Sequence, residues 1–151
     1  MAAAASSFLN SGLAVTIASL VQARAAAQVA AELGQSILLL STPAAAAQAG
    51  GGWFAALIET LHSQGKNSVI GILDCGSQPG WVLESLTLPL HGVVFSESRA
   101  PSGAVVGERL RGLVTNAGRL YFTERPMAIN LIDFQDEEAT VAFLRREWHH
   151  G

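Results

Sequence analysis

Short, continuously apolar stretches recur along this 151-residue chain, and a stretch of good helix-forming residues follows each of them. Strands that are buried on both faces of a parallel sheet have this continuous apolar pattern. Their regular alternation with helices is typical of α/β folds. The predicted strands span residues 12–17, 36–41, 69–73, 92–95 and 120–122, and residues 128–132 form either a sixth strand or a continuation of the fifth.

Capping residues, glycines and apolar stripes predict the helices between these strands. Ser19 offers an N-cap, and Gln22 completes the pattern of a capping box. Gly34, Gly65 and Gly118 follow helical stretches, where glycine commonly ends a helix. The predicted helices span residues 20–33, 53–63, 79–88, 102–116 and 136–148.

This pattern predicts a single-domain, open and mainly parallel α/β sheet of five or six strands with helices on both faces. The type is Rossmann-like or flavodoxin-like, with a half-barrel-like arrangement as the alternative. The units are too few for a closed eight-stranded barrel. We expect residues 1–11 to be a flexible N-terminus, residues 12–148 to form the domain, and residues 149–151 to be a tail.

Composition and charge exclude several classes of function. The net charge is −3 and the chain has no basic face, so a nucleic-acid partner is not expected. Serines, glycines and a proline interrupt the uncharged runs, so no membrane partner is expected. Cys75 is the single cysteine and cannot form an internal disulfide, which favours the cytoplasm. Charged residues make up only 14% of the chain, and we expect a homo-oligomer, most simply a dimer.

Known cofactor motifs are missing from the sequence. No P-loop sequence is present, and the first strand-to-helix turn, at residues 17–20, lacks the dinucleotide glycines, so ATP and NAD are not supported. One cysteine and scattered histidines do not supply a zinc site, so no metal is expected. Lys66, the single lysine, precedes a strand on the opposite edge, which argues against Schiff-base chemistry. The cofactor therefore stays unknown.

A ligand site in an open parallel sheet lies beyond the carboxyl ends of the strands. The glycines at residues 50–52 and 76–80 open helices at this edge, where backbone N–H groups suit an anion. Asp74 and Glu97 are the candidate general acid–base groups there. Asp74 can instead cap a helix, and Cys75 can be either a reactive thiol or a buried filler. The ligand-binding candidates are Ser41, Thr42, Gly50, Gly51, Asp74, Cys75, Gly76, Ser96, Arg99 and Arg125.

Three functions fit these observations. The first is a soluble domain that binds a small polar or anionic ligand at the carboxyl edge. The second is a non-catalytic homo-oligomeric assembly or interaction protein, and the third is a lyase or isomerase that uses Asp74 or Glu97 as its acid–base group.

Several local sequences resemble those of a group of small bacterial α/β proteins without an established activity. The resemblance is carried by the segment Ala30–Gly34, by Trp53–Phe54 and above all by Leu73-Asp74-Cys75-Gly76. It implies the same fold and supplies no reaction. The units also resemble pieces of phosphate-binding α/β barrels such as aldolases, and without a pocket lysine that likeness is architectural.

Overall fold

A computed structural model describes residues 12–43, 45–46, 50–100 and 103–149 of the chain. The predicted flexible segment 1–11 and the last two residues of the predicted tail lie outside these ranges. None of the described helices is both long enough and apolar enough to cross a membrane.

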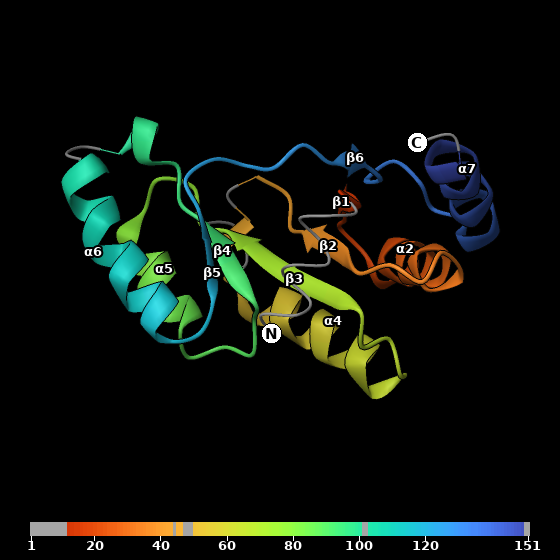
Figure 1. Ribbon diagram of the computed structural model, residues 1–151, viewed down its shortest axis with the longest axis horizontal. Coiled ribbons are helices and arrows are strands. Elements are labelled where there is room, and N and C mark those ends of the chain that lie inside the picture. Colours follow the sequence, from red (N-terminus) through yellow and green to blue (C-terminus); the bar gives the residue numbers. More distant parts are fainter. Residues whose placement is uncertain (1–11, 44, 47–49, 101–102, 150–151) are drawn as a thin grey trace.

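One sheet of six parallel strands forms the centre of the fold, in the order β5-β4-β3-β2-β1-β6 (Figure 1). This arrangement confirms the predicted open parallel α/β sheet. Strands β1 to β5 are neighbours in chain order, as in the half-barrel-like alternative, and β6 pairs with the far side of β1. The strands are β1 (Ala14–Thr16), β2 (Ile37–Leu40), β3 (Val69–Asp74), β4 (Gly92–Val94), β5 (Leu120–Phe122) and β6 (Ile129–Asn130).

The helices begin and end close to their predicted limits. They are α2 (Leu20–Glu32), α4 (Gly52–Ser63), α5 (Pro79–Ser85), α6 (Gly103–Asn116), α7 (Glu137–His149) and the short 3-10 helix η1 (Glu97–Arg99). Helix α5 ends three residues earlier than predicted. The Arg119 guanidinium donates hydrogen bonds to the carbonyls of Ser85 and Leu86, at 2.8 and 3.1 Å. A further α-helical turn could not satisfy the Ser85 carbonyl, because the residue four positions on is Pro89, which has no N–H.

Gln22 caps α2 and also holds the chain that leads to α7. The Ser19 hydroxyl accepts a hydrogen bond from the Gln22 N–H, and the Gln22 side chain accepts one from the N–H of Ala18, not from that of Ser19. The amide of the same side chain donates to the carbonyls of Ile132 and Phe134. Gln22 therefore joins the start of α2 to the segment before α7. Helix α7 itself packs against α2.

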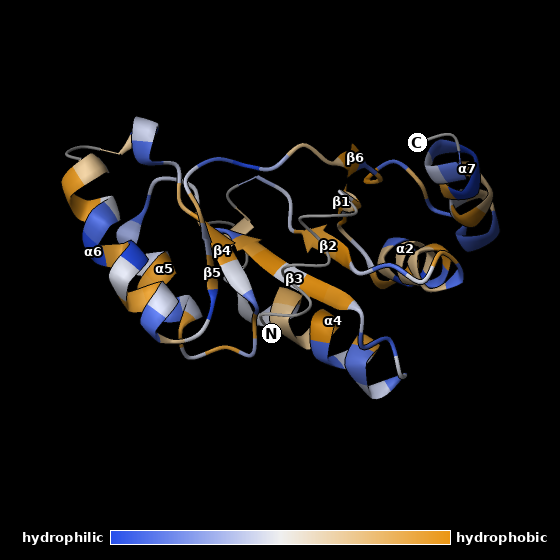
Figure 2. Cartoon of the chain, in the orientation of Figure 1, coloured by the Kyte–Doolittle hydropathy of each residue, from blue (hydrophilic) through white to orange (hydrophobic). Residues whose placement is uncertain are grey.

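Apolar side chains of the strands point alternately to the two faces of the sheet. The larger buried cluster includes Val15, Leu39 and Val93 and receives side chains from all five described α-helices. The smaller cluster has strand residues such as Leu38, Leu40 and Ile72 as its buried members. Helices on both faces were predicted. The helices described here join the cluster on one face, because right-handed crossovers between successive neighbouring strands lead to one side. Figure 2 shows that the central strands are mainly hydrophobic, whereas the helices carry both hydrophobic and hydrophilic residues.

The connection from β5 to β6 is a short link that crosses the sheet. It runs from one edge strand of the sheet to the other through residues 123–128 (Figure 1). Six strands spaced about 4.8 Å apart make a sheet about 24 Å wide. The peptide steps between Phe122 and Ile129 reach about 25 Å at full extension. The chain bends at Thr123 and Glu124, so the link is shorter than this limit and the sheet must curve to bring its two edges closer together. The link passes over the carboxyl ends of the central strands, where Arg125 contacts three of them.

The opposite, amino edge carries His62 and His91, whose rings lie edge to face with centroids 5.2 Å apart. The Nδ1 atom of His91 accepts a hydrogen bond of 2.9 Å from the N–H of Gly71 in β3. Burial, followed by the neighbouring charges of His62 and Arg119, lowers the pKa of His91 to about 4. Neutral His91 is the form that fits this contact, because a protonated Nδ1 could not accept the bond.

The low pKa of His91 predicts a loss of stability in mild acid. An unfolded chain protonates histidine near pH 6.5, whereas the folded chain does so only near pH 4. The free energy of unfolding should therefore decline as the pH falls from about 6.5 toward 4. Urea titrations across this window measure the slope. His91→Asn keeps an acceptor and removes the titration, so its slope should be smaller. An equal slope in both proteins would contradict the assignment.

Candidate functional site

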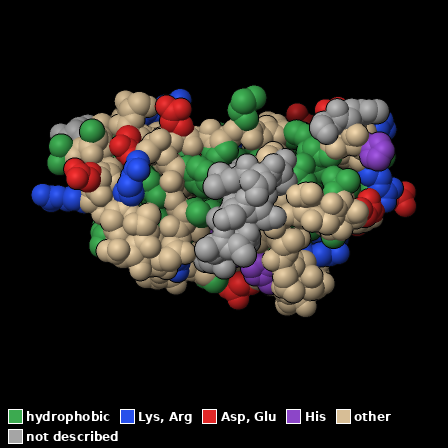
Figure 3. All heavy atoms as spheres, viewed as in Figure 1, with side chains coloured by type: hydrophobic (Ala, Val, Ile, Leu, Met, Phe, Trp, Pro, Cys, Tyr) green, Lys and Arg blue, Asp and Glu red, His purple; other side chains and the backbone are tan. Residues whose placement is uncertain are grey.

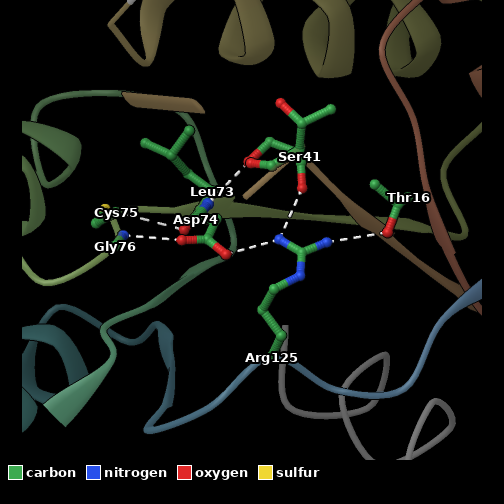
Figure 4. A network of polar contacts seen from close by, with 8 residues as sticks. Thr16, Ser41, Leu73, Asp74, Cys75, Gly76 and Arg125 are labelled. Carbon is green, nitrogen blue, oxygen red and sulfur yellow. Dashed lines mark hydrogen bonds and ion pairs between the residues drawn. The ribbon is translucent and has the colours of Figure 1, made fainter. Parts of the chain in front are cut away.

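The carboxyl ends of β1, β2 and β3 converge on the side chain of Arg125, which extends from the β5–β6 link (Figure 4). Its Nη1 atom donates to the Ser41 carbonyl at 2.9 Å and forms an ion pair of 2.6 Å with Oδ2 of Asp74. Its Nη2 atom donates to the Thr16 hydroxyl at 2.9 Å. One guanidinium thus holds the link against three strand ends.

Asp74, the last residue of β3, is 2% exposed. Its Oδ2 atom binds Arg125, and its Oδ1 atom accepts a hydrogen bond of 2.8 Å from the N–H of Gly76. Its own N–H donates to the Ser41 hydroxyl at 2.8 Å. The carboxylate closes a tight turn in which Gly76 has a φ of 60°, a conformation that favours glycine. Asp74 therefore caps this turn, and Gln78 takes the N-cap position of α5.

Cys75 is fully buried within the larger apolar cluster. Burial, with the charges of Asp74 and Glu84 as smaller causes, raises the pKa of its thiol to about 12. A reactive cysteine needs a thiolate and access to solvent. These properties support the buried-filler interpretation of Cys75.

A cavity of about 340 Å³ opens at this edge, beside the Asp74–Arg125 ion pair. Five of the predicted ligand-binding residues line it together, which are Asp74, Gly76, Ser96, Arg99 and Arg125. Ser41 lies beneath them, where its hydroxyl and carbonyl position Asp74 and Arg125. The other lining residues are Pro43, Ser98 and Glu124.

Glu97 follows β4 but lies in a different hollow, with Ala104, Glu108 and Arg111. The Tyr121 hydroxyl donates to its Oε2 atom at 2.9 Å, and the Arg111 guanidinium lies 3.9 Å from the same oxygen. A Cβ atom at Gly107 would come within 2.6 Å of Glu97 Oε1, so this glycine lets the carboxylate pack against α6. Burial, and then Glu97, raise the pKa of Tyr121. Glu97 thus serves the packing of α6.

The remaining candidates do not line the cavity. Gly50 has a φ of 72° and its N–H binds the carbonyl of Ala46. At Gly51, a Cβ atom would lie 2.7 Å from the Leu88 side chain, so this glycine permits core packing. Thr42 is half-buried near the cavity residue Pro43. The expectation of free anion-binding N–H groups is not met at Gly76, whose N–H already binds Asp74.

Two polar contributors, Thr16 and Ser98, were missing from the sequence-based candidates, whereas Glu124 was expected at this edge. Thr16 ends β1 and was overlooked, although the rule that sites lie at carboxyl ends applies to it. Ser98 and Glu124 enter the cavity from segments that follow β4 and β5. Within the described ranges, no group of three or more histidine, cysteine or acidic side chains could hold a metal ion.

Comparisons with known proteins add no assignment. No protein-family model matches the chain, and no curated protein matches it as a relative.

The Arg125 contacts predict that Arg125→Gln lowers the free energy of unfolding by about 3 kcal/mol, because the buried Asp74 carboxylate loses its counter-ion. A matched control is Arg145→Gln, which breaks an Arg–Glu ion pair of the same 2.6 Å length at Glu32. Both partners of that pair are exposed, so its loss should cost less than about 1 kcal/mol. Urea denaturation followed by circular dichroism measures both changes. Equal losses would show that Arg125 does not anchor the link.

Proposed function

We propose that this protein binds a small polar or anionic metabolite in the carboxyl-edge cavity. The observation that carries the proposal is the ion pair between buried Asp74 and half-buried Arg125, beside a cavity of about 340 Å³. That volume is at the small end of ligand pockets in general. The hydroxyls of Ser96 and Ser98 and the guanidinium of Arg99 form no hydrogen bond or ion pair with other described residues, so they are available to a ligand.

The contacts of the two candidate acid–base groups support binding over lyase or isomerase chemistry. Both oxygens of Asp74 already accept hydrogen bonds, from Gly76 and Arg125. Glu97 lies in another hollow beside Tyr121 and Arg111. A general base must reach the proton that it removes. Proton transfer by Asp74 would break the contacts that fix the edge of the sheet.

Filling the cavity should abolish binding without unfolding the protein. We expect Ser96→Phe to lower the occupancy of bound metabolite at least tenfold, because the larger side chain takes the ligand's space. Native mass spectrometry measures occupancy, in the protein as purified and in a defined mixture of sugars, sugar phosphates, carboxylic acids and amino acids. Asn67→Phe, at an exposed turn before β3, is the matched control and should bind normally. Equal occupancy in both variants, or no adduct at millimolar concentrations, would contradict the proposal.

A second proposed role is self-association through the outer face of α6. Val105 and Leu113 on this helix are 62% and 49% exposed, and they border a hollow that also includes Glu108, Arg109 and Gly112. Glu108 and Arg109 form no ion pair with other described residues. Two copies of such a face can pair acid with base, so we propose a homodimer. In Figure 3, acidic and basic side chains both appear at the end of the molecule that carries α6.

A charge placed on this face should prevent the dimer. We expect Leu113→Glu to convert the protein to a monomer in sedimentation equilibrium, because the new carboxylate would be buried between copies. Leu83→Glu is a matched control, since Leu83 is 46% exposed on α5. A dimer that survives Leu113→Glu, or a native protein that is monomeric at all concentrations, would overturn this role.

We further propose that the protein works in the cytoplasm. Its single cysteine is buried and has no second cysteine with which to form a disulfide within the chain. Such a protein gains no stability from an oxidising compartment.

A further inference from the structure

The cavity at the carboxyl edge is lined by four charged side chains, and only two of them are paired with each other. Asp74 and Arg125 form the ion pair of 2.6 Å at its inner side. Arg99 and Glu124 also line the cavity, are exposed, and have no ion-pair partner among the described residues. The paired charges cancel one another, so the unpaired charges decide which ligand the cavity favours.

Arg99 and Glu124 reach the cavity from two neighbouring strands. Arg99 is the last residue of η1, which follows β4, and Glu124 follows β5. The N–H of Phe95 donates to the Phe122 carbonyl at 2.9 Å, which ties these two strand ends together. The N–H of Ser96 donates to the Gly76 carbonyl at 2.8 Å, and this fixes the start of the segment that carries Arg99. The two unpaired charges thus lie on segments anchored to the same edge.

We propose that the ligand is a zwitterion, a small molecule such as an amino acid with a carboxylate and an ammonium group. This inference rests on the proposed binding function of the same cavity. The ligand's carboxylate would bind Arg99, and its ammonium group would bind Glu124. A ligand with only a negative charge would meet the Glu124 carboxylate, and one with only a positive charge would meet Arg99. Only a ligand with both charges gains at both residues. The hydroxyls of Ser96 and Ser98 add hydrogen-bonding groups near its polar atoms.

Three matched sets of probes test the charge requirement. The first set is the twenty common amino acids. The second is their N-acetyl derivatives, which keep the carboxylate and lose the ammonium charge. The third is their amides, which keep the ammonium and lose the carboxylate. Binding to the full-length protein is measured by saturation-transfer NMR and then by titration calorimetry. We expect at least one amino acid to bind, and both of its derivatives to bind at least tenfold more weakly.

Two variants assign the charges to residues. Glu124→Gln should weaken the amino acid at least tenfold and leave its N-acetyl derivative unchanged or tighter. Arg99→Gln should weaken the amino acid and leave its amide unchanged or tighter. Glu59→Gln, at an exposed position of α4, is the control and should change neither.

The outcomes separate this inference from the proposed function beneath it. An N-acetyl derivative or a simple carboxylate that binds as tightly as the amino acid would overturn the zwitterion assignment, and the cavity would remain a binding site for anions. The assignment would also fall if none of the three sets binds at millimolar concentrations. Adducts that appear only with sugars, and vanish in Ser96→Phe, would then still uphold the proposed function.

Discussion

The arrangement of the carboxyl edge of this sheet depends on the contacts that one side chain, Arg125, makes with three strand ends. The link between β5 and β6 joins the two edge strands of the sheet and crosses over the strand ends between them. Arg125, within that link, binds the ends of β1, β2 and β3 together. A segment that would otherwise contact the sheet only at its two ends is thereby held at an intermediate point. The wall that this segment gives the cavity is consequently fixed before any ligand arrives.

A buried carboxylate explains why the anchor is an arginine. Asp74 is 2% exposed, and burying an unpaired carboxylate would be very unfavourable. Arginine presents several donors in one plane, so it can meet Asp74, the Ser41 carbonyl and the Thr16 hydroxyl at once. Lysine has a single ammonium group and could not reproduce this geometry. The result is an electrically balanced inner wall, beside which Arg99 and Glu124 have no ion-pair partner among the residues that the structure describes.

The fold could be predicted from sequence because its signals are local. Apolar strands, glycine stops and the Ser19–Gln22 pattern each depend on residues a few positions apart, and the predicted strands and helices match the structure closely. The position of β6 in the sheet was harder to predict, since it depends on the path of the β5–β6 link. The parallel pairing of β6 with β1 follows from that path. No local pattern in residues 128–132 indicates it.

The sequence could assign the candidate residues to one edge of the sheet. It could not show which of them contact each other. Asp74, Gly76, Ser96, Arg99 and Arg125 could be assigned to one cavity because the carboxyl ends of parallel strands share an edge. Thr16 follows from the same rule, yet its role appears only when Arg125 is placed opposite it. Contacts between residues about one hundred positions apart leave no periodicity in the sequence.

Asp74 and Glu97 show how the nearest cation decides the role of a carboxylate. Both lie at or just beyond the carboxyl ends of neighbouring strands, so sequence alone makes them equivalent candidates for acid–base chemistry. Arg125 reaches Asp74 from the β5–β6 link, while Arg111 and Tyr121 surround Glu97 from α6 and β5. Each carboxylate is therefore committed to holding two segments together. Glu124, which has no such partner among the described residues, is the acidic group of this cavity that remains free to contact a ligand. An exposed carboxylate at the rim suits the recognition of a charged group, which is why the geometry of this edge favours binding.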